Sequence, residues 1–310
     1  MKNDTINIAC STNDNYAPHM GVMLYSLLKN CSSPDRVRIY VADGGISTEN
    51  KDKLKKVVDL FKAELNYLLP NTSYFKNLAI GRHFGIETYY RFFLMDHVKV
   101  KKMLYLDCDL IFEGDVSALY AYNLGKNIVA AVKDFGDSSK RNLILGLGKE
   151  DPYFNAGVLL VDCERFRKEK ITKKVIEFIK HNLEKVEFAD QDGLNAILTG
   201  KWREIDMSWN VMPKLAYHKY FFWENISSEE NRKISELLRK PKIIHYSSYI
   251  KPWYLVDMMP LKGRYHFYLK DTPWRDQPYK DASIIGIIKR LSSYFLFFYY
   301  KRRSLKSLKS

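Results

Sequence analysis

The chain has 310 residues, of which 46% are apolar and 28% are charged, so it can bury one large core or two smaller ones. Four cysteines lie far apart without a C-x-x-C pair, which argues against a zinc site or a disulfide framework and suits a reducing cytosol. The first residues contain no long apolar run, so we expect no secretory signal.

The net charge of +14 is unevenly distributed along the chain. Residues 282–310 contain seven Lys or Arg and no acidic residue, so half of the excess lies in this short segment. A basic surface can attract nucleic acid or an anionic membrane. No nucleic-acid-binding motif is present, so we assign the charge to a membrane.

The first third of the chain alternates strands with helices. We expect strands at 5–10, 36–42 and 64–69 and helices at 16–30 and 47–62. This alternation predicts βαβ units and a parallel sheet, in which ligands bind beyond the carboxyl ends of the strands.

The pattern continues further along the chain. We expect strands at 103–106, 127–133, 154–161 and 242–246 and helices at 87–94, before 147, at 162–184, 190–199 and 228–239. The prediction is an α/β fold with one catalytic domain at 1–255, a linker or extension at 256–281 and a basic tail at 282–310.

The strand at 103–106 ends in Asp107-Cys108-Asp109. In extended backbone, residues i and i+2 point the same way, so both carboxylates can face one point. Two close carboxylates repel each other, and Mg²⁺ or Mn²⁺ would remove that conflict. A lone D-x-D is more often an acidic turn, so the rest of the chain must decide. There is no G-x-G-x-x-G after the first strand and no G-x-x-x-x-G-K-[ST], which disfavours dehydrogenases and P-loop proteins.

Several stretches together resemble one family. They are CSTNDNYAPHMGV, ETYYRFFL, YLDCDLIFEGD, FNAGVLLVD, FADQDGLN and HYSSYIKPW, in this order. The chain resembles, over roughly residues 5–255, the retaining glycosyltransferases that include glycogenin and the bacterial lipooligosaccharide α-galactosyl- and α-glucosyltransferases. The resemblance implies a GT-A fold, a Rossmann-like and mostly parallel sheet flanked by helices, with a UDP-hexose donor.

The resemblance also implies a cation site. Asp107 and Asp109 match the metal-binding pair, and His245 matches the histidine that completes it. A nitrogen ligand shifts the preference toward Mn²⁺, with Mg²⁺ also possible. Taken alone, His245 would be a core histidine at a strand end.

Further positions match donor contacts of the family. These are Ser11, Thr12, Asn13, Asn15, Arg91, Cys108 through its backbone, Asp134, Asn155, Ser248 and Lys251. Two of them depart from the pattern, because Asn13 stands where Asp is frequent and Ser248 where Gly is usual. Arg91 could instead pair with Glu87 one helical turn away. Asp134 and Asn155 could cap neighbouring elements, and we interpret Asp14 as part of a polar turn.

Asp190 and Gln191 match the reaction centre of the family. Asp190 would bond the sugar hydroxyls. A carboxamide is a poor nucleophile, so a double displacement through a glycosyl-enzyme is not evident. The resemblance implies a same-face mechanism in which Gln191 stabilises an oxocarbenium-like state.

The residue pattern of the tail predicts a helix that lies in a membrane interface. Ile284, Ile285, Ile287, Ile288, Leu291, Phe295 and Phe298 share one helical face. Lys289 and Arg290 interrupt the apolar run, so a spanning helix is disfavoured, although a core-packing helix is an alternative.

The acceptor, a glycan or glycolipid, should lie near residues 209–223. We therefore expect a cytoplasmic enzyme held peripherally at the inner face of the membrane. The alternatives are a sugar-1-phosphate nucleotidyltransferase, which should carry a Gly-rich first loop, or a non-catalytic glycan-binding protein.

Overall fold

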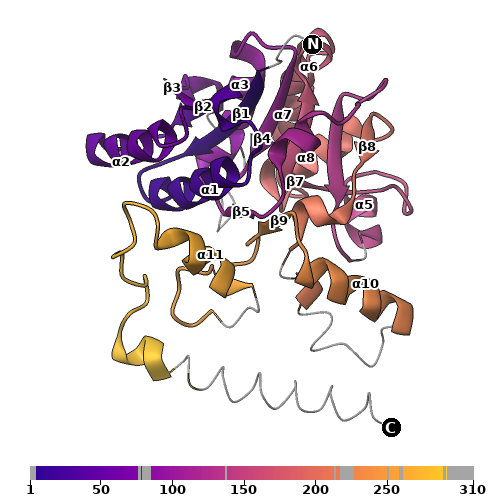
Figure 1. Ribbon diagram of the computed structural model, residues 1–310. Coiled ribbons are helices and arrows are strands. Elements are labelled where there is room, and N and C mark those ends of the chain that lie inside the picture. The colour runs from indigo at the N-terminus through magenta and orange to yellow at the C-terminus, as the bar shows by residue number, and fades with distance from the viewer. Residues whose placement is uncertain are drawn as a thin grey trace.

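The computed structural model describes residues 5–75, 78, 85–136, 138–212, 214–216, 227–249, 251–257, 261–288 and 291 (Figure 1). The strands are β1 (Ile6–Thr12), β2 (Val37–Asp43), β3 (Glu64–Leu68), β4 (Lys102–Leu106), β5 (Leu110–Phe112), β6 (Val129–Lys133), β7 (Phe154–Asp162), β8 (Trp202–Glu204) and β9 (Ile243–His245). Seven of them form one sheet in the order β3-β2-β1-β4-β7-β6-β8.

Helices cover both faces of this sheet. They are α1 (Ala17–Lys29), α2 (Thr48–Asp59), α3 (Tyr90–His97), α4 (Val116–Tyr120), α5 (Ser139–Ile144), α6 (Cys163–Lys168), α7 (Ile171–His181), α8 (Ala189–Leu198), α10 (Ser228–Arg239) and α11 (Lys262–Leu269), with 3₁₀ turns η1 (Pro34–Arg36), η2 (Thr72–Phe75), η3 (Ile86–Tyr89) and η4 (Met207–Asn210). The apolar faces of α1 and α2 pack in one buried cluster, and those of α3, α6, α7 and α8 pack in a second. The predicted three-layer α/β architecture is confirmed.

β7 runs against its neighbours. The pairs β1–β2, β2–β3 and β1–β4 are parallel, whereas β7 is antiparallel to both β4 and β6. The beginning of β7 therefore lies at the edge of the sheet where β1 and β4 end. Asn155 reaches the ligand-binding edge from the start of its strand, while Thr12 reaches it from the end of another.

The D-x-D residues are not part of a strand. β4 ends at Leu106, residues 107–109 bend, and β5 follows at once. The expectation that strand alternation would align the two carboxylates is wrong, because the bend aligns them. The predicted last strand pairs with β5 in a separate two-stranded sheet, in which Leu110 lies opposite His245.

The helix expected over 162–184 is divided into α6 and α7. Lys170 between them has a φ of 55°, a left-handed conformation that interrupts the helix. Residues 87–94 begin as η3 and become α3 only at Tyr90.

The segment after the catalytic core packs on α1 (Figure 1). The indole Nε1 of Trp274 donates to Asn50 Oδ1 at 2.9 Å, and Lys29 lies 3.2 Å from Asp271. Tyr265 and Trp274 are buried in the same cluster as α1. Residues 261–281 thus form an extension that is packed against the domain.

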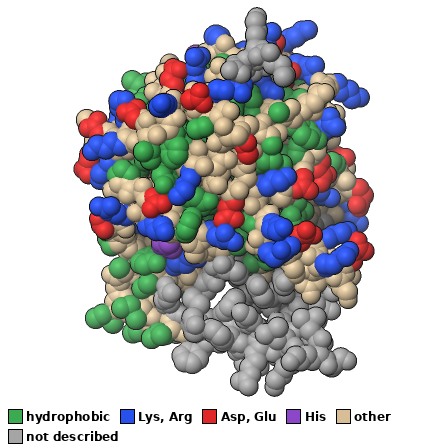
Figure 2. All heavy atoms as spheres, in the orientation of Figure 1, with side chains coloured by type: hydrophobic (Ala, Val, Ile, Leu, Met, Phe, Trp, Pro, Cys, Tyr) green, Lys and Arg blue, Asp and Glu red, His purple; other side chains and the backbone are tan. Residues whose placement is uncertain are grey.

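A short helix of residues 284–288 follows. Its apolar side chains are exposed, Ile284 by 78% and Ile285 by 66%. Figure 2 shows hydrophobic side chains gathered over this segment at lower left. Most of the predicted tail, including Phe295 and Phe298, lies outside the described residues. Within the described part of the chain, no helix has the length and apolar character needed to cross a bilayer.

Candidate active site

A cavity of about 220 Å³ lies at the edge of the sheet where β1 and β4 end. Its lining residues are Ser11, Thr12, Asn13, Tyr16, Gly85, Glu87, Thr88, Arg91, Tyr105, Asp107, Cys108, Asp109 and Lys251. Eight of them were predicted to bind the donor or its cation. Asn15 is exposed, and neither Asn15 nor Ser248 is among the lining residues.

Asp107, Asp109 and His245 converge at one side of this cavity. One potential ligand atom from each lies within 4.8 Å of the others. His245 Nε2 is 3.3 Å from Asp109 Oδ1 and 3.8 Å from Asp107 Oδ2. Because β9 pairs with β5, a histidine distant in sequence is held beside the bend that carries both carboxylates.

This donor set fits a divalent cation. Two carboxylates and an imidazole nitrogen are oxygen and nitrogen ligands of the kind that Mn²⁺ accepts. An added Cβ on Gly157 would lie 2.3 Å from His245 Cε1 and 2.9 Å from Asp107 Oδ2, so only glycine lets β7 pass this close. The thiol of Cys108 donates to Ser11 O at 3.3 Å and is not part of the cluster.

Lys251 adds a positive charge to the cavity. Its Nζ lies 2.6 Å from Asp109 Oδ2 and donates to Tyr246 O at 2.7 Å. Burial alone would raise the pKa of Asp109, but Lys251 and His245 hold that pKa below its ordinary value. Asp109 is therefore ionised and ready to bind a cation.

Arg91 is buried and joins two acidic residues. Its Nη2 donates to Asp107 Oδ1 at 3.0 Å, and its Nε lies 2.9 Å from Asp190 Oδ2. Its Nη1 donates to Ala156 O at 2.7 Å. The alternative pairing with Glu87 is wrong, since Glu87 instead accepts from Asn13 Nδ2 at 2.9 Å.

Asp190 is a buried carboxyl at the start of α8. Burial raises its pKa to about 6, although Arg91 and a hydrogen bond from Thr88 oppose the shift. The Oδ2 atom is close to Arg91 Nε but makes no hydrogen bond, because that N–H donates to Thr88 O. The Oδ2 atom of Asp190 is therefore buried against the Arg91 guanidinium and held by charge.

The Gln191 amide has partners on both of its ends. Its Oε1 accepts from Ala156 N at 3.0 Å and Asn155 Nδ2 at 3.2 Å. Its Nε2 donates to Asp134 Oδ2 at 3.2 Å and Tyr153 O–H at 3.3 Å. The predicted residues Asp134 and Asn155 are thus brought together around Gln191, on its donor and acceptor sides.

Asp192 has a structural role, unlike Asp190 and Gln191. It is fully buried and accepts from Arg141 Nε at 2.8 Å, Tyr153 O–H at 2.7 Å and Phe188 N at 2.7 Å. Its bonds fix the loop before α8 and thereby the position of Asp190 and Gln191.

Polar residues at the end of β1 and in the turn after it have different partners. Ser11 Oγ lies 2.7 Å from the Tyr105 hydroxyl, and Thr12 is buried beside it. Asp14 accepts from Ser47 N at 2.8 Å and Asn50 Nδ2 at 2.8 Å, as its interpretation as a turn residue requires.

Several site residues were not predicted. Thr88 lies three residues before Arg91, and Tyr105 lies two before Asp107, so both could have been found from helical and strand periodicity. Asn210 in η4 accepts through Oδ1 from Nδ1 of the His245 ring at 2.9 Å. Nothing in the sequence MSWN distinguishes it.

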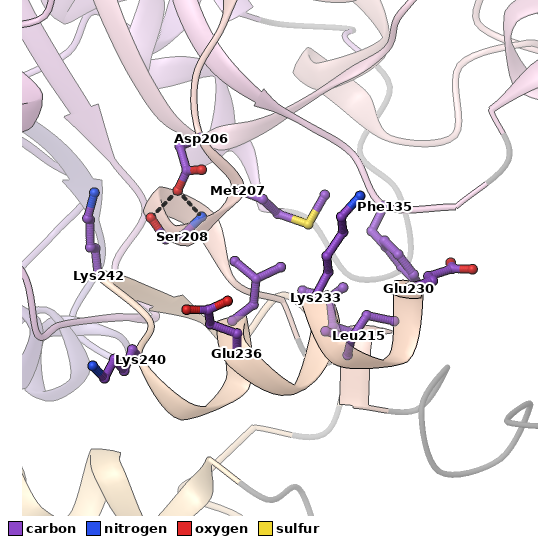
Figure 3. A pocket seen from close by; sticks show the side chains of 12 residues that line it. Phe135, Asp206, Met207, Ser208, Leu215, Glu230, Lys233, Glu236, Lys240 and Lys242 are labelled. Carbon is purple, nitrogen blue, oxygen red and sulfur yellow. Dashed lines mark hydrogen bonds between the residues drawn. The ribbon is translucent and has the colours of Figure 1, made fainter. Parts of the chain in front are cut away.

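A second cavity, of about 570 Å³, lies between η4 and α10 (Figure 3). Phe135, Met207 and Leu215 contribute apolar surface, and Lys233, Lys240 and Lys242 contribute charge. Lys214 Nζ, beside Leu215 in sequence, lies 2.8 Å from Asp134 Oδ1. Phe135, which lines this cavity, directly follows Asp134, the partner of Gln191 Nε2.

The mostly parallel sheet flanked by helices, with an acidic cluster at the carboxyl ends of its strands, is the GT-A fold of glycosyltransferases. Residues 7–255 match the sequence model of glycosyl transferase family 8. The chain belongs to that family.

Relatives and solved structures agree with this assignment. The chain is 33% identical to general stress protein A of Bacillus subtilis, over 88% of this chain and 96% of that protein. It is 26% identical to the lipopolysaccharide 1,3-galactosyltransferase of Salmonella typhimurium, over 87% of this chain and 80% of that enzyme. It shares its fold with galactosyltransferase LgtC, solved with donor and acceptor sugar analogues, with a TM-score of 0.76 and 24% identity over 87% of this chain and 99% of that chain.

Proposed function

We propose that this glycosyltransferase moves a hexose, galactose or glucose, from a UDP-sugar to a glycan acceptor with retention of configuration. The acceptor is a lipopolysaccharide or another cell-surface polysaccharide, as similarity to lipopolysaccharide galactosyl- and glucosyltransferases suggests. The convergence of Asp107, Asp109 and His245 beside Lys251 carries the proposal, because a diphosphate needs a local positive charge.

The cation is Mn²⁺, with Mg²⁺ as a substitute, and Asp107, Asp109 and His245 would hold it. When bound, it supplies Lewis-acid stabilisation for the charge that grows on the departing diphosphate. Lys251 would exchange part of its contact with Asp109 for a diphosphate oxygen, adding a second positive charge. The nucleoside end would lie against Ser11, Thr12 and Asn13, which line the same cavity.

The sugar would lie between Asp190 and Gln191. Asp190, whose Oδ2 lies beside Arg91 without a hydrogen bond, would accept from a sugar hydroxyl when the donor binds. The Gln191 amide is fixed by four hydrogen bonds, so it would act through its dipole and not as a nucleophile. The acceptor hydroxyl would attack from the face that the diphosphate leaves, and a phosphate oxygen would take its proton.

The acceptor would approach from the side of Asp134. The cavity between η4 and α10 supports this direction, because Phe135 at its edge follows Asp134 directly (Figure 3). The Phe135→Ala variant should raise the KM for acceptor severalfold and leave donor hydrolysis unchanged.

The exposed isoleucines at 284–288 support attachment to an anionic membrane. Ile284 and Ile285 are mostly exposed, and apolar side chains of this size gain free energy by leaving water. The basic residues that follow in the sequence would contact lipid headgroups.

Family membership argues against the two alternatives, a nucleotidyltransferase and a non-catalytic glycan-binding protein. The test is a panel of nucleotide sugars with Mn²⁺, in which release of UDP from each donor is followed. We expect turnover of UDP-galactose or UDP-glucose and a melting shift with Mn²⁺ plus UDP. Absence of both for every UDP-hexose would contradict the proposal.

A further inference from the structure

A continuous series of side-chain hydrogen bonds joins the cation site to the reaction centre. His245 Nδ1 lies 2.9 Å from Asn210 Oδ1, and Asn210 Nδ2 lies 2.9 Å from Asn155 Oδ1. Asn155 Nδ2 in turn lies 3.2 Å from Gln191 Oε1. We name Asn210, Asn155 and Gln191 the amide chain.

Two backbone N–H groups fix the direction of every bond in the amide chain. A backbone N–H can only donate, so Gly157 N at 3.1 Å requires an oxygen at Asn155 Oδ1, and Ala156 N at 3.0 Å requires an oxygen at Gln191 Oε1. Asn210 must then present its NH₂ group to Asn155. The carbonyl oxygen of Asn210 is left facing the imidazole.

The orientation of Asn210 determines the tautomer of His245. An amide oxygen accepts only, so Nδ1 of the ring must carry the proton and donate. The other nitrogen, Nε2, faces Asp107 and Asp109 and is the one left to bind a metal ion. An imidazole that donates from Nδ1 and binds metal through Nε2 is the usual metal-binding form.

We infer that Asn210 is a positioning residue that holds His245 in its metal-binding tautomer and, through Asn155, ties the cation site to the Gln191 amide. Three of these residues are buried: His245 is 3% exposed, Asn210 0% and Asn155 7%. Water therefore cannot easily replace a lost partner. The inference rests on the proposed cation site, but the tautomer itself can be measured without a metal.

The first experiment records the tautomer of His245 in the full chain. The protein is labelled with ¹⁵N-histidine, and the ring nitrogens are assigned at pH 8 without metal. We expect a proton on Nδ1. An unprotonated Nδ1 would overturn the inference, whether or not the protein binds Mn²⁺.

The second experiment measures Mn²⁺ affinity by calorimetry and by the free Mn²⁺ signal in electron paramagnetic resonance. Asn210→Ala should weaken binding by about 10- to 100-fold, as loss of an outer partner of a metal-binding histidine usually does. Asn142→Ala is the matched control, because Asn142 is equally buried but bonds backbone oxygens of Lys149 and Asp151. Equal affinity of the Asn210→Ala variant and the wild type would overturn the inference.

The Asn210→Asp variant separates the tautomer of His245 from the link between Asn210 and Asn155. A carboxylate still accepts from Nδ1, so Mn²⁺ affinity should stay within about threefold of the wild type. It cannot donate to Asn155, so kcat should fall while metal affinity is kept. If Asn210→Asp weakens Mn²⁺ binding as much as Asn210→Ala does, a hydrogen-bond acceptor for Nδ1 is not sufficient. The inference then fails. Wild-type protein that binds no Mn²⁺ would contradict the proposed function and leave the tautomer measurement to decide the inference.

Discussion

Lys251 Nζ lies 2.6 Å from Asp109 Oδ2, although the two residues are 142 positions apart in the chain. The ammonium occupies the place next to the cation site where a diphosphate oxygen would bind. Before a donor binds, Lys251 thus offsets part of the negative charge of the carboxylates. After the donor binds, the same group can neutralise the phosphate.

Replacement of Lys251 should therefore reduce donor use. Loss of a charged hydrogen bond costs about 1.5–3 kcal/mol, so Lys251→Ala should lower kcat/KM for the UDP-sugar by about ten- to a hundredfold. Steady-state kinetics with saturating Mn²⁺ measure this decrease in kcat/KM. Lys53→Ala, which removes only the surface pair with Glu49, should change kcat/KM less than twofold. An unchanged Lys251→Ala enzyme would refute the contact with diphosphate.

Gln191→Glu should impair catalysis because of its neighbour Asp134. Gln191 Nε2 lies 3.2 Å from Asp134 Oδ2, and a glutamate would place a second carboxylate there. One of the two would have to take up a proton. We expect kcat at pH 7 to fall more than about tenfold, with partial recovery at lower pH, in a pH series of donor hydrolysis. The other glutamine of the chain, Gln277, is exposed, and Gln277→Glu should be silent.

Gly157→Ala should damage the cation site and the fold together. The new methyl group would lie 2.3 Å from His245 Cε1, and overpacking of a buried site costs about 1–3 kcal/mol. We expect a lower melting temperature and Mn²⁺ binding weakened at least about tenfold. Gly263→Ala in α11, where an added Cβ meets nothing within 4 Å, should raise the melting temperature slightly. Equal effects of the two substitutions would contradict the steric argument.

Stability should depend on pH through His19, which joins α1 to the C-terminal extension. Its ring stacks on Trp253 at 3.4 Å between centroids, and Nδ1 lies 2.7 Å from the Tyr265 hydroxyl. Burial first, and Lys280 second, lower the pKa of His19 well below 6.5. The unfolded chain therefore binds the proton more readily, and the stabilisation present above pH 6.5 is lost as the pH falls below that value.

The effect should reach up to about 1.4 kcal/mol per pH unit in the free energy of unfolding. His19→Phe keeps a ring against Trp253 and removes the titrating group, so its stability should vary less between pH 6.5 and 5. Urea denaturation at several pH values measures both proteins. Identical pH slopes would show that His19 is not the group responsible.

The exposed isoleucines should control membrane attachment. In the full chain, Ile284→Ser combined with Ile285→Ser should reduce co-sedimentation with anionic vesicles severalfold and leave donor hydrolysis intact. Leu183→Ser is the control, because Leu183 is 45% exposed at another place on the surface. Deletion of residues 282–310 should release the protein fully. If that deletion unfolds the domain, the tail is part of the core.

The fold was predictable where local pattern decides. Alternating apolar strands and amphipathic helices predicted β1, α1, β2, α2 and β3 within a residue or two at most boundaries. The antiparallel direction of β7 was not predictable, because a fully buried strand has the same apolar pattern in either direction. β5 was missed because three residues carry no readable periodicity.

The site was predictable as a set of residues but not as a network. Motif spacing indicated Asp107, Asp109 and His245, and the structure brings them together. Arg91 lines the cavity as expected, but its hydrogen bonds to Asp107, Thr88 O and Ala156 O could not be read from the sequence. Asn210 could not be found, because a buried amide is recognised by its partners and these lie in two different elements, β7 and β9.

The pairing of β9 with β5 has a consequence for how the enzyme is made. The strand that carries His245 is the last of the nine, and its partner is synthesised more than a hundred residues earlier. A nascent or truncated chain that ends before β9 can form the D-x-D bend but has no histidine to complete the three-residue cluster. Under the proposed function, a chain that ends before β9 should therefore bind Mn²⁺ more weakly than the full chain.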